Sequence, residues 1–156
     1  TIKEGLMIPS AGIDESNANG DWYLLFPEKP FESAKRIHQF LKKHFALKNV
    51  GVIITDSHTS PLRRGVTGVA LSYWGFRAVK SCVGQADIYG RPLQMTHVNI
   101  VDALATSAVL TMGEANERCP LALISCEGLE FADLIDPSEV QIAPEEDLYK
   151  SLYLKA

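Results

Sequence analysis

Cysteine is scarce in this sequence. The 156 residues include three cysteines, Cys82, Cys119 and Cys126. Their odd number argues against a complete disulfide framework, and they lack the CxxC or Cys/His spacing of a metal site. Buried, reduced thiols in a cytosolic setting are the simplest interpretation. The sequence therefore predicts a cytoplasmic protein that is not held together by disulfides or structural zinc.

Long apolar runs and an excess of positive charge are also missing. No run approaches the roughly 20 apolar residues that cross a bilayer, and no signal peptide opens the chain. Asp and Glu number 19 against 15 Lys and Arg, which gives a formal net charge of −4. This balance argues against a broad nucleic-acid surface but allows a small phosphate pocket with a few arginines. We expect a soluble protein that partners with neither membrane nor nucleic acid.

What is present fits one globular domain over residues 1–156. The hydrophobic fraction of 46% is large enough for a core, and no repeat or linker divides the chain. Strand and helix patterns are mixed, which predicts an α+β fold, or an α/β fold with a mixed sheet. Strands are expected at residues 2–8, 22–26, 50–55, 66–72, 78–83, 93–97 and 120–126, and those at 22–26 and 120–126 are apolar enough to be buried. Helices are expected at 31–47, at 99–112 with Asn99 as the cap, and at 144–154.

The first predicted helix is amphipathic. Pro30 suits a first helical position. Apolar residues recur at helical spacing and should face the core, at Ala34, Ile37, Leu41 and Phe45. His38 and His44 have no carboxylate partner at ligand spacing, so we interpret them as partly exposed helix residues.

Three acidic segments predict a divided metal and phosphate site. The first contains Asp14 and Asn17, the second contains Asp56 and Ser57, and the third contains Glu114. Oxygen ligands on separate loops are what Mg²⁺ or Mn²⁺ bound to nucleotide phosphates requires. The alternative is a set of ordinary turn and capping carboxylates.

Asp56 is expected where the buried strand at residues 50–55 ends. There a carboxylate would be held at the rim of the core, beside the hydroxyl of Ser57 and the forked donors of Arg63 and Arg64. Glu114 directly follows Gly113, a residue type that commonly ends helices, and should project from the helix end. A lone glutamate at such a position is usually solvated, so residue patterns alone leave its role open.

Four ordered blocks resemble a known family. They read AGIDESN from Ala11, VIITDSHTSPLRRGVTGVALS from Val52, GQADIYGRPL from Gly84 and VNIVDALATSAVLTMGE from Val98. In this order they closely resemble the coenzyme F420 gamma-glutamyl ligases and bacterial relatives labelled folate-metabolism gamma-glutamate ligases. The resemblance covers residues 5–125.

The resemblance implies a GTP-dependent ligase. Such an enzyme adds L-glutamate in gamma linkage to a coenzyme carboxylate and releases GDP and phosphate. The family also implies two divalent cations, Mg²⁺ or Mn²⁺, an α+β fold and an intertwined homodimer. A γ-phosphoryl group would first pass to the poorly electrophilic carboxylate, and the amine of glutamate would then attack the acyl phosphate. Arg63 and Arg64 are candidate catalytic residues that would steady phosphates or a substrate carboxylate.

Site residues follow from the matching motif positions. Asp14 and Asp56 resemble ligands of one metal, and Ser57 and Glu114 resemble ligands of the other. Asn17 resembles a nucleotide contact. The segment expected to lie along the nucleotide comprises Met112, Gly113, Glu114, Ala115, Asn116, Glu117, Arg118 and Cys119.

Two features depart from the family pattern. Deazaflavin-coenzyme ligases usually read RRGQTDVA, whereas Val66 and Gly68 stand here in place of a polar and an acidic residue. This difference favours the folate-labelled relatives. Family members also begin with an additional segment that contributes to the nucleotide site. We therefore expect this chain to be the later part of a longer product and to be incomplete as a catalyst by itself.

Two other classes of function remain open at this point. A non-catalytic nucleotide or metal-binding module would keep the fold and bind ligands without glutamate-dependent nucleotide hydrolysis. A purely structural fragment would use its carboxylates only to cap turns, so that Asp14→Ala and Asp56→Ala would leave metal affinity unchanged. The ligase is preferred because the acidic positions match in kind and order.

Overall fold

Short antiparallel strand pairs and two α-helices make up the fold of the described residues. The computed structural model describes residues 1–3 and 5–153. All four strand pairs that it describes are antiparallel, so the α+β class is confirmed, whereas the expected mixed sheets are not found in this part of the chain. The elements in chain order are β1 (Ile2–Lys3), β2 (Leu6–Met7), the 3-10 helix η1 (Pro9–Gly12), β3 (Ile13–Asp14), β4 (Leu24–Leu25), α1 (Pro30–His44), β5 (Val52–Thr59), β6 (Val66–Trp74), β7 (Val79–Ser81), β8 (His97–Asn99), α2 (Ile100–Met112) and the 3-10 helix η2 (Lys150–Leu152).

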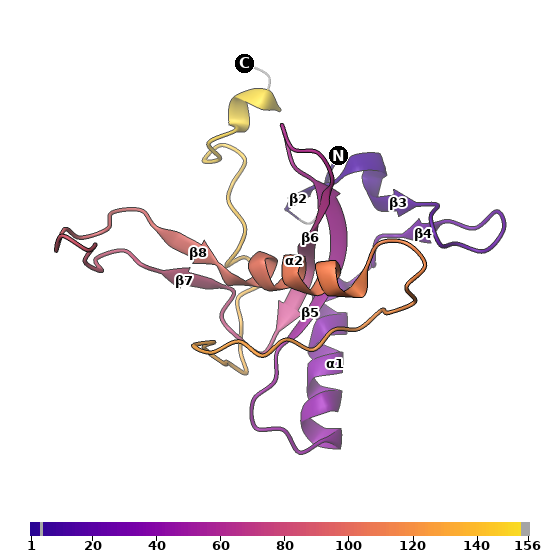
Figure 1. The fold of residues 1–156 in the computed structure, drawn as a ribbon, viewed down its shortest axis with the longest axis horizontal. Helices are drawn as coiled ribbons and strands as arrows, with labels where there is room; N and C mark the ends of the chain where they lie inside the picture. The colour runs from indigo at the N-terminus through magenta and orange to yellow at the C-terminus, as the bar shows by residue number, and fades with distance from the viewer. Residues whose placement is uncertain (4, 154–156) are drawn as a thin grey trace.

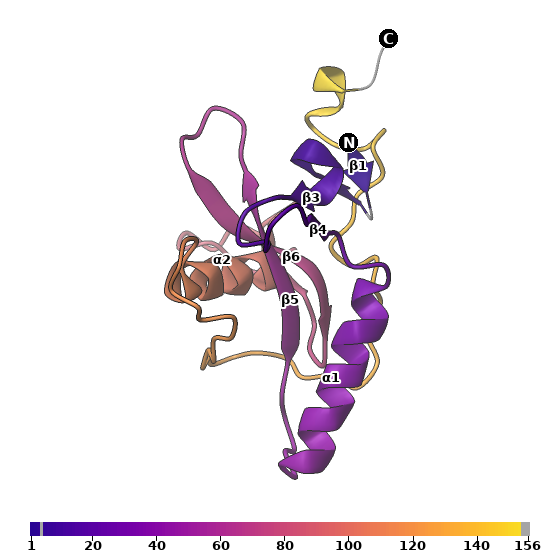
Figure 2. The same ribbon diagram turned by 90° about the vertical axis from the view of Figure 1, so that its right-hand side faces the viewer.

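A long β5–β6 ribbon forms the centre of the molecule. The register runs from the pair Val52 and Trp74 to the pair Thr59 and Val66. Figures 1 and 2 show α2 against one face of the ribbon and α1 against the other, and both helices contact both strands. The register shifts between Ile54 and Thr55, where a β-bulge interrupts the ladder. The ribbon is therefore the scaffold on which both helices are placed.

Helix α2 lies directly on β6 because Gly68 has no side chain. A Cβ atom at Gly68 would overlap the carbonyl group of Ala105 in the helix. Two side chains of α2 also satisfy backbone groups of β6. Asp102 Oδ1 accepts a hydrogen bond from Ala70 N at 2.9 Å, and Thr106 Oγ1 donates to the Gly68 carbonyl at 2.9 Å. Small residues and polar bonds together fix the helix on the strand.

Local signals set both ends of α2 as predicted. Asn99 Oδ1 accepts a hydrogen bond from Asp102 N at 3.1 Å and so caps the first turn. Gly113 follows the last turn with a φ of +84°, a backbone conformation that L-residues with side chains rarely adopt. The chain therefore leaves the helix sharply at Glu114.

Helix α1 also forms where predicted and buries Ala34 as expected, but His38 rather than Ile37 completes its buried face. Its buried residues are Pro30, Ala34 and His38, whereas the side chain of Ile37 is 43% exposed. The interpretation of His38 as a partly exposed residue was therefore wrong. Gly75 explains the orientation, because a Cβ atom there would overlap the His38 ring. Burial, together with the nearby Lys42 ammonium, lowers the pKa of His38, which favours the neutral imidazole.

The buried core is small and lies along the ribbon. One cluster gathers where β6 continues toward β7, and the other lies beside the β-bulge. Both clusters draw on β6, so this strand links the two parts of the core. The first consists of Tyr73, Phe76, Ala78 and Val101, and the second of Phe26, Val69 and Leu71.

Several predicted strands take a different form. The segment 2–8 turns at Gly5 and becomes the β1–β2 hairpin rather than one strand. Residues 22–26, expected to be buried, include only the short strand β4, and the side chain of Trp22 is 76% exposed. The strand expected at 93–97 begins only at His97. Apolar composition indicated strands here without fixing where pairing occurs.

The end of the chain departs further from expectation. Residues 120–126 are exposed and form no strand, although their composition suggested a buried one. Cys119 and Cys126 are likewise exposed, so the expectation of buried thiols was wrong for them. The helix expected at 144–154 is reduced to η2 within the described residues, and residue 154 lies outside them. An apolar run pairs only where a strand edge is available to it.

The chain exposes a large surface for its size. Its accessible area is 12005 Å², whereas a compact monomer of 17.2 kDa would expose about 7,800 Å². Figure 1 shows the cause, because the β7–β8 hairpin and the loop between β3 and β4 extend away from the ribbon in opposite directions. Of the helices in the described part of the chain, none has the length and apolar character needed to cross a membrane.

The close contact at Gly68 can be tested by whether Gly68→Ala raises or lowers the free energy of unfolding. A glycine within a strand is ordinarily less favourable than alanine, so Gly68→Ala in open space would stabilise the protein. Because the added methyl group meets the Ala105 carbonyl, we expect Gly68→Ala to lower the free energy of unfolding by about 1–3 kcal/mol. Urea denaturation measures this change, and an unchanged or raised midpoint would contradict the close packing of α2 on β6.

Candidate functional site

A cleft of about 700 Å³ lies between β3, β5 and the chain that leaves α2. The structure brings together in it most of the residues that the sequence singled out. Asp14 and Asn17 come from the β3 segment, and Asp56 and Ser57 come from β5. The remainder of its wall includes the entire segment after α2 that was expected along a nucleotide, namely Met112, Gly113, Glu114, Ala115, Asn116, Glu117, Arg118 and Cys119.

Asp14 is held in place by a tight turn. Ser16 N donates to Asp14 Oδ1 at 2.8 Å, and Ser16 Oγ donates to Asp14 Oδ2 at 2.8 Å. These two hydrogen bonds, the backbone one first, lower the pKa of Asp14 below its usual value. The carboxylate is therefore ionised and oriented, as a metal ligand must be, although the same bonds also serve an ordinary turn.

Asp56 lies within β5 rather than beyond its end. The strand continues to Thr59, so the expected strand end was placed too early. The β-bulge between Ile54 and Thr55 immediately precedes it, and bulges commonly re-aim side chains beside active sites. Asp56 Oδ1 accepts a hydrogen bond from Ser57 N at 2.7 Å. Each carboxylate oxygen has two lone pairs, so capacity for another ligand remains.

Glu114 and Glu117 enter the cleft from the turn after α2. Glu117 folds back, and its Oε2 accepts a hydrogen bond from Ala115 N at 2.8 Å. This bond shapes the loop, whereas Glu114 is exposed. Because Gly113 ends the helix here, the negative end of the α2 dipole also faces this side of the cleft.

The electrostatics of the cleft favour cations. Its described walls carry four carboxylates, those of Asp14, Asp56, Glu114 and Glu117, against the single guanidinium of Arg118, which gives a formal charge of −3. The helix C-terminus adds to this negative field. A polyphosphate alone would be repelled, so an anionic nucleotide fits this cleft only together with divalent cations.

The protein ligands are too few to hold a metal alone. Among residues 1–3 and 5–153, no three His, Cys, Asp or Glu side chains gather closely enough to hold a metal ion. This spacing fits Mg²⁺, which usually takes one or two carboxylates and completes its shell with phosphate oxygens and water. The donor set therefore suits a cation that arrives with phosphates rather than a permanent metal cage.

Arg63 and Arg64 are not brought into the cleft. They lie in the turn between β5 and β6, where Arg63 N donates to the Ser60 carbonyl at 3.2 Å. They line neither the cleft nor the neighbouring cavity described next. The ribbon rises about 3.3 Å per residue, so the turn begins roughly 10–15 Å beyond Asp56. The length of the hairpin, which sequence patterns did not show, carries the arginines away.

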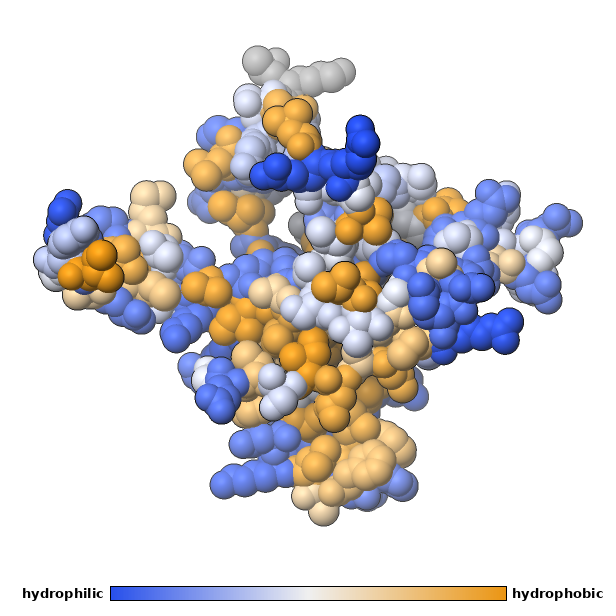
Figure 3. Space-filling model, in the orientation of Figure 1, coloured by the Kyte–Doolittle hydropathy of each residue, from blue (hydrophilic) through white to orange (hydrophobic). Residues whose placement is uncertain are grey.

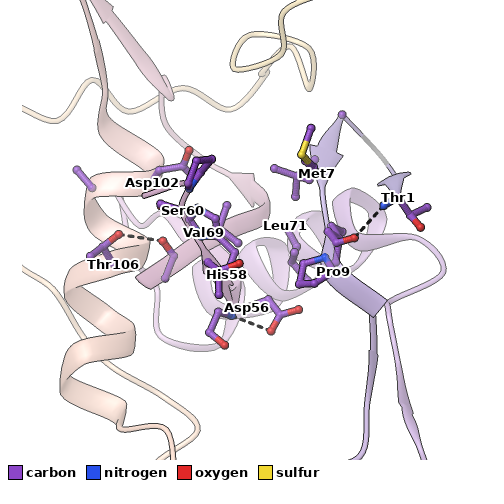
Figure 4. A pocket seen from close by; sticks show the side chains of 18 residues that line it. Thr1, Met7, Pro9, Asp56, His58, Ser60, Val69, Leu71, Asp102 and Thr106 are labelled. Carbon is purple, nitrogen blue, oxygen red and sulfur yellow. Dashed lines mark hydrogen bonds between the residues drawn. The ribbon is translucent and has the colours of Figure 1, made fainter. Parts of the chain in front are cut away.

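A second cavity of about 760 Å³ meets the cleft at Asp56 and Ser57, which line both. Figure 4 shows Met7 and Pro9 on one side of it and α2 on the other. Sequence analysis missed this cavity, because its walls come from three separate parts of the chain. Among its described residues that do not also line the cleft, only Asp102 carried a visible signal, as an acidic residue in the first turn of α2.

Fold and site together define an α+β protein with an acidic cleft suited to phosphate-bound divalent cations. Comparison with known families gives the more specific assignment. The sequence profile of the F420-0:Gamma-glutamyl ligase family matches residues 1–125. This chain belongs to that family.

Curated relatives agree with this assignment. The coenzyme F420:L-glutamate ligase of Methanocaldococcus jannaschii is 38% identical over 145 residues, which cover 90% of this chain and 57% of the relative. The enzyme of the same name from Methanopyrus kandleri is 38% identical over 152 residues, which cover 96% and 60%. That of Archaeoglobus fulgidus is 36% identical over 148 residues, which cover 95% and 58%. The chain thus spans less than two thirds of the length of these relatives.

The turn that holds Asp14 makes a measurable prediction. Ser16→Ala removes one of the two bonds that favour the carboxylate, so the pKa of Asp14 should rise toward its usual value. Carboxyl ¹³C chemical shifts followed through a pH titration measure it. Ser138→Ala is the matched control, because Ser138 also donates from both its backbone N and its hydroxyl to Asp136, there to Oδ1 alone. It should raise the pKa of Asp136 and leave Asp14 unchanged. An unaltered Asp14 pKa in Ser16→Ala would contradict the geometry.

Proposed function

We propose that this chain carries the nucleotide and metal site of a gamma-glutamyl ligase. The observation that supports the proposal best is the convergence of Asp14, Asn17, Asp56, Ser57 and the turn after α2 on one cleft. These are the positions that matched the family motifs. The relatives named as coenzyme F420:L-glutamate ligases support the same chemistry. The substrates would be GTP, L-glutamate and the carboxylate of a coenzyme.

The proposed cation ligands fall into two pairs. Asp14 and Asp56 would hold one Mg²⁺ or Mn²⁺, and Ser57 and Glu114 would hold the other. Each pair supplies two protein oxygens and leaves the other positions for phosphate and water, in keeping with the sparse donor set. When bound, such cations neutralise the charge that develops on transferring phosphate oxygens.

The proposed reaction has two steps. The acceptor carboxylate takes the γ-phosphoryl group of GTP, which gives an acyl phosphate and GDP. The amine of L-glutamate then attacks the carbonyl carbon and loses a proton, phosphate leaves, and an amide bond forms. The role of this chain is to hold the triphosphate along the turn after α2 and to aim the γ-phosphate at the space beside Asp56 and Ser57.

The acceptor follows from the relatives rather than from the cleft. Their names specify coenzyme F420, so a deazaflavin precursor with a free carboxylate is the proposed acceptor. A folate carrying a free carboxylate is the alternative, because Val66 and Gly68 depart from the usual deazaflavin-ligase pattern. Gly68 has a structural explanation in the packing of α2, which weakens its value as a sign of acceptor choice.

A non-catalytic binding module is the second candidate. It is favoured by one observation, namely that Arg63 and Arg64 lie outside the cleft of the same chain. We therefore assign them no step within this chain. The module would bind metal and nucleotide without joining glutamate to an acceptor.

We also propose that the protein is a homodimer. Its accessible surface exceeds that of a compact monomer by about 4,000 Å², an area that obligate interfaces can bury. Figure 3 shows apolar residues across the middle and lower part of one face. Leu110, Leu121 and Leu123 are more than 80% exposed, at 85%, 83% and 98%. A second copy would remove these side chains from water.

Glutamate-dependent phosphate release tests the ligase. With GTP, Mn²⁺, L-glutamate and each acceptor in parallel, Asp56→Asn should lower the rate at least about 100-fold, because a carboxylate ligand is lost. Glu28→Gln is the matched control, since it removes an exposed carboxylate that lines neither cavity. It should leave the rate unchanged. GTP and Mn²⁺ binding without release, with either acceptor, would instead indicate the binding module.

Sedimentation equilibrium tests the dimer. The protein should sediment at twice its monomer mass, and Leu121→Lys combined with Leu123→Lys should shift it toward monomer by placing charges in the interface. Asn19→Lys adds charge at an exposed position of the β3–β4 loop and should leave the dimer intact. A monomeric wild-type protein would show that the apolar face is covered in another way.

A further inference from the structure

The second cavity is large and has one polar end. It lies between the β1–β2 hairpin with η1, the β5–β6 ribbon, and α2 (Figure 4). Its volume of about 760 Å³ is in the range of pockets that hold cofactor-sized ligands. It opens onto the acidic cleft at Asp56 and Ser57, which both spaces share. A ligand lying in it would therefore reach the place assigned to the γ-phosphate.

The walls of the cavity favour a ring system over free glutamate. They include the apolar side chains of Leu6, Met7, Ile8, Val69 and Leu71. No lysine or arginine occurs among the described residues that line it, and Asp102, which is not one of the proposed cation ligands, would repel the side-chain carboxylate of glutamate. A planar heterocycle would instead gain from contact with the apolar walls.

Polar groups on two walls of the cavity are held in place by hydrogen bonds within the protein. Asp102 and Thr106 already bond the backbone of β6, so they hold the α2 wall rigid. His58 Nδ1 lies 3.2 Å from the Thr67 carbonyl. Because a carbonyl oxygen only accepts, Nδ1 carries the proton in this bond, and Nε2 is left for a ligand. A heterocycle with donor and acceptor edges could use Nε2 and the hydroxyl of Ser60.

We propose that this cavity holds the heterocyclic part of the acceptor coenzyme, with the terminal carboxylate of the acceptor directed to Asp56 and Ser57. The inference rests on the proposed ligase function and adds where its acceptor binds. The acceptor would lie on the opposite side of Asp56 from the nucleotide, so its carboxylate meets the γ-phosphate where the two spaces join. Such an arrangement brings the reacting groups together without either ligand crossing the other.

Steric blocking from two walls tests the proposal. Met7→Trp fills the cavity from β2, and Ala103→Trp fills it from an exposed position of α2, so neither change disturbs the buried core. Each should weaken acceptor binding about tenfold or more. Met95→Trp is the matched control, because Met95 is 81% exposed and lines neither cavity. Isothermal titration with F420-0 and, in a parallel arm, tetrahydrofolate monoglutamate gives the affinity, and titration with GTP and Mn²⁺ gives the nucleotide affinity.

The proposal predicts weaker acceptor binding in both cavity variants. Their affinity for GTP and Mn²⁺ and their melting temperature should equal those of the wild-type protein and of Met95→Trp. Acceptor binding unchanged in both variants would overturn it, while leaving the ligase function intact, and would indicate that a second copy or another polypeptide segment covers the cavity. Binding of GTP with Mn²⁺ but of neither acceptor by the wild-type protein would overturn both this proposal and the ligase function.

Discussion

The seating of α2 on β6 is the contact on which the rest of the structure depends. Gly68 allows the helix backbone to reach the strand, and Asp102 and Thr106 satisfy the strand's backbone groups. Overlap with a side chain at position 68 would push the helix outward. The helix end at Gly113 would move with it, and so would Glu114, which lines the same cleft as Asp56. A packing constraint in the core therefore sets the geometry of the site.

The placement of α2 also shapes the electrostatic field of the acidic cleft. Phosphate sites on proteins often use the positive N-terminus of a helix, whereas here the C-terminus of α2 and four carboxylates line the cleft. The negative charge of the cleft attracts cations and repels free phosphates, so a phosphate group would bind there only together with a cation.

The extended shape of the chain leaves an exposed apolar segment next to the cleft. The β7–β8 hairpin projects from the ribbon, and residues 120–126 lie exposed directly after the loop that lines the cleft. Apolar side chains at such positions gain stability only when another surface covers them. The segment after α2 thus lines the cleft at its beginning and exposes the apolar side chains of Leu121 and Leu123 at its end.

Sequence alone determined the features that depend on neighbouring residues. Pro30, Asn99 and Gly113 placed helix ends, because caps act within one turn, and ordered motifs named the acidic residues of the cleft. Tertiary structure alone decided that His38 rather than Ile37 of α1 is buried, that residues 120–126 remain unpaired, and that Arg63 and Arg64 lie beyond the cleft. It also created the second cavity. The burial of His38 and the position of α2 depend on packing between distant segments, at Gly75 and Gly68 respectively, and hydrophobic periodicity carries no information about such partners.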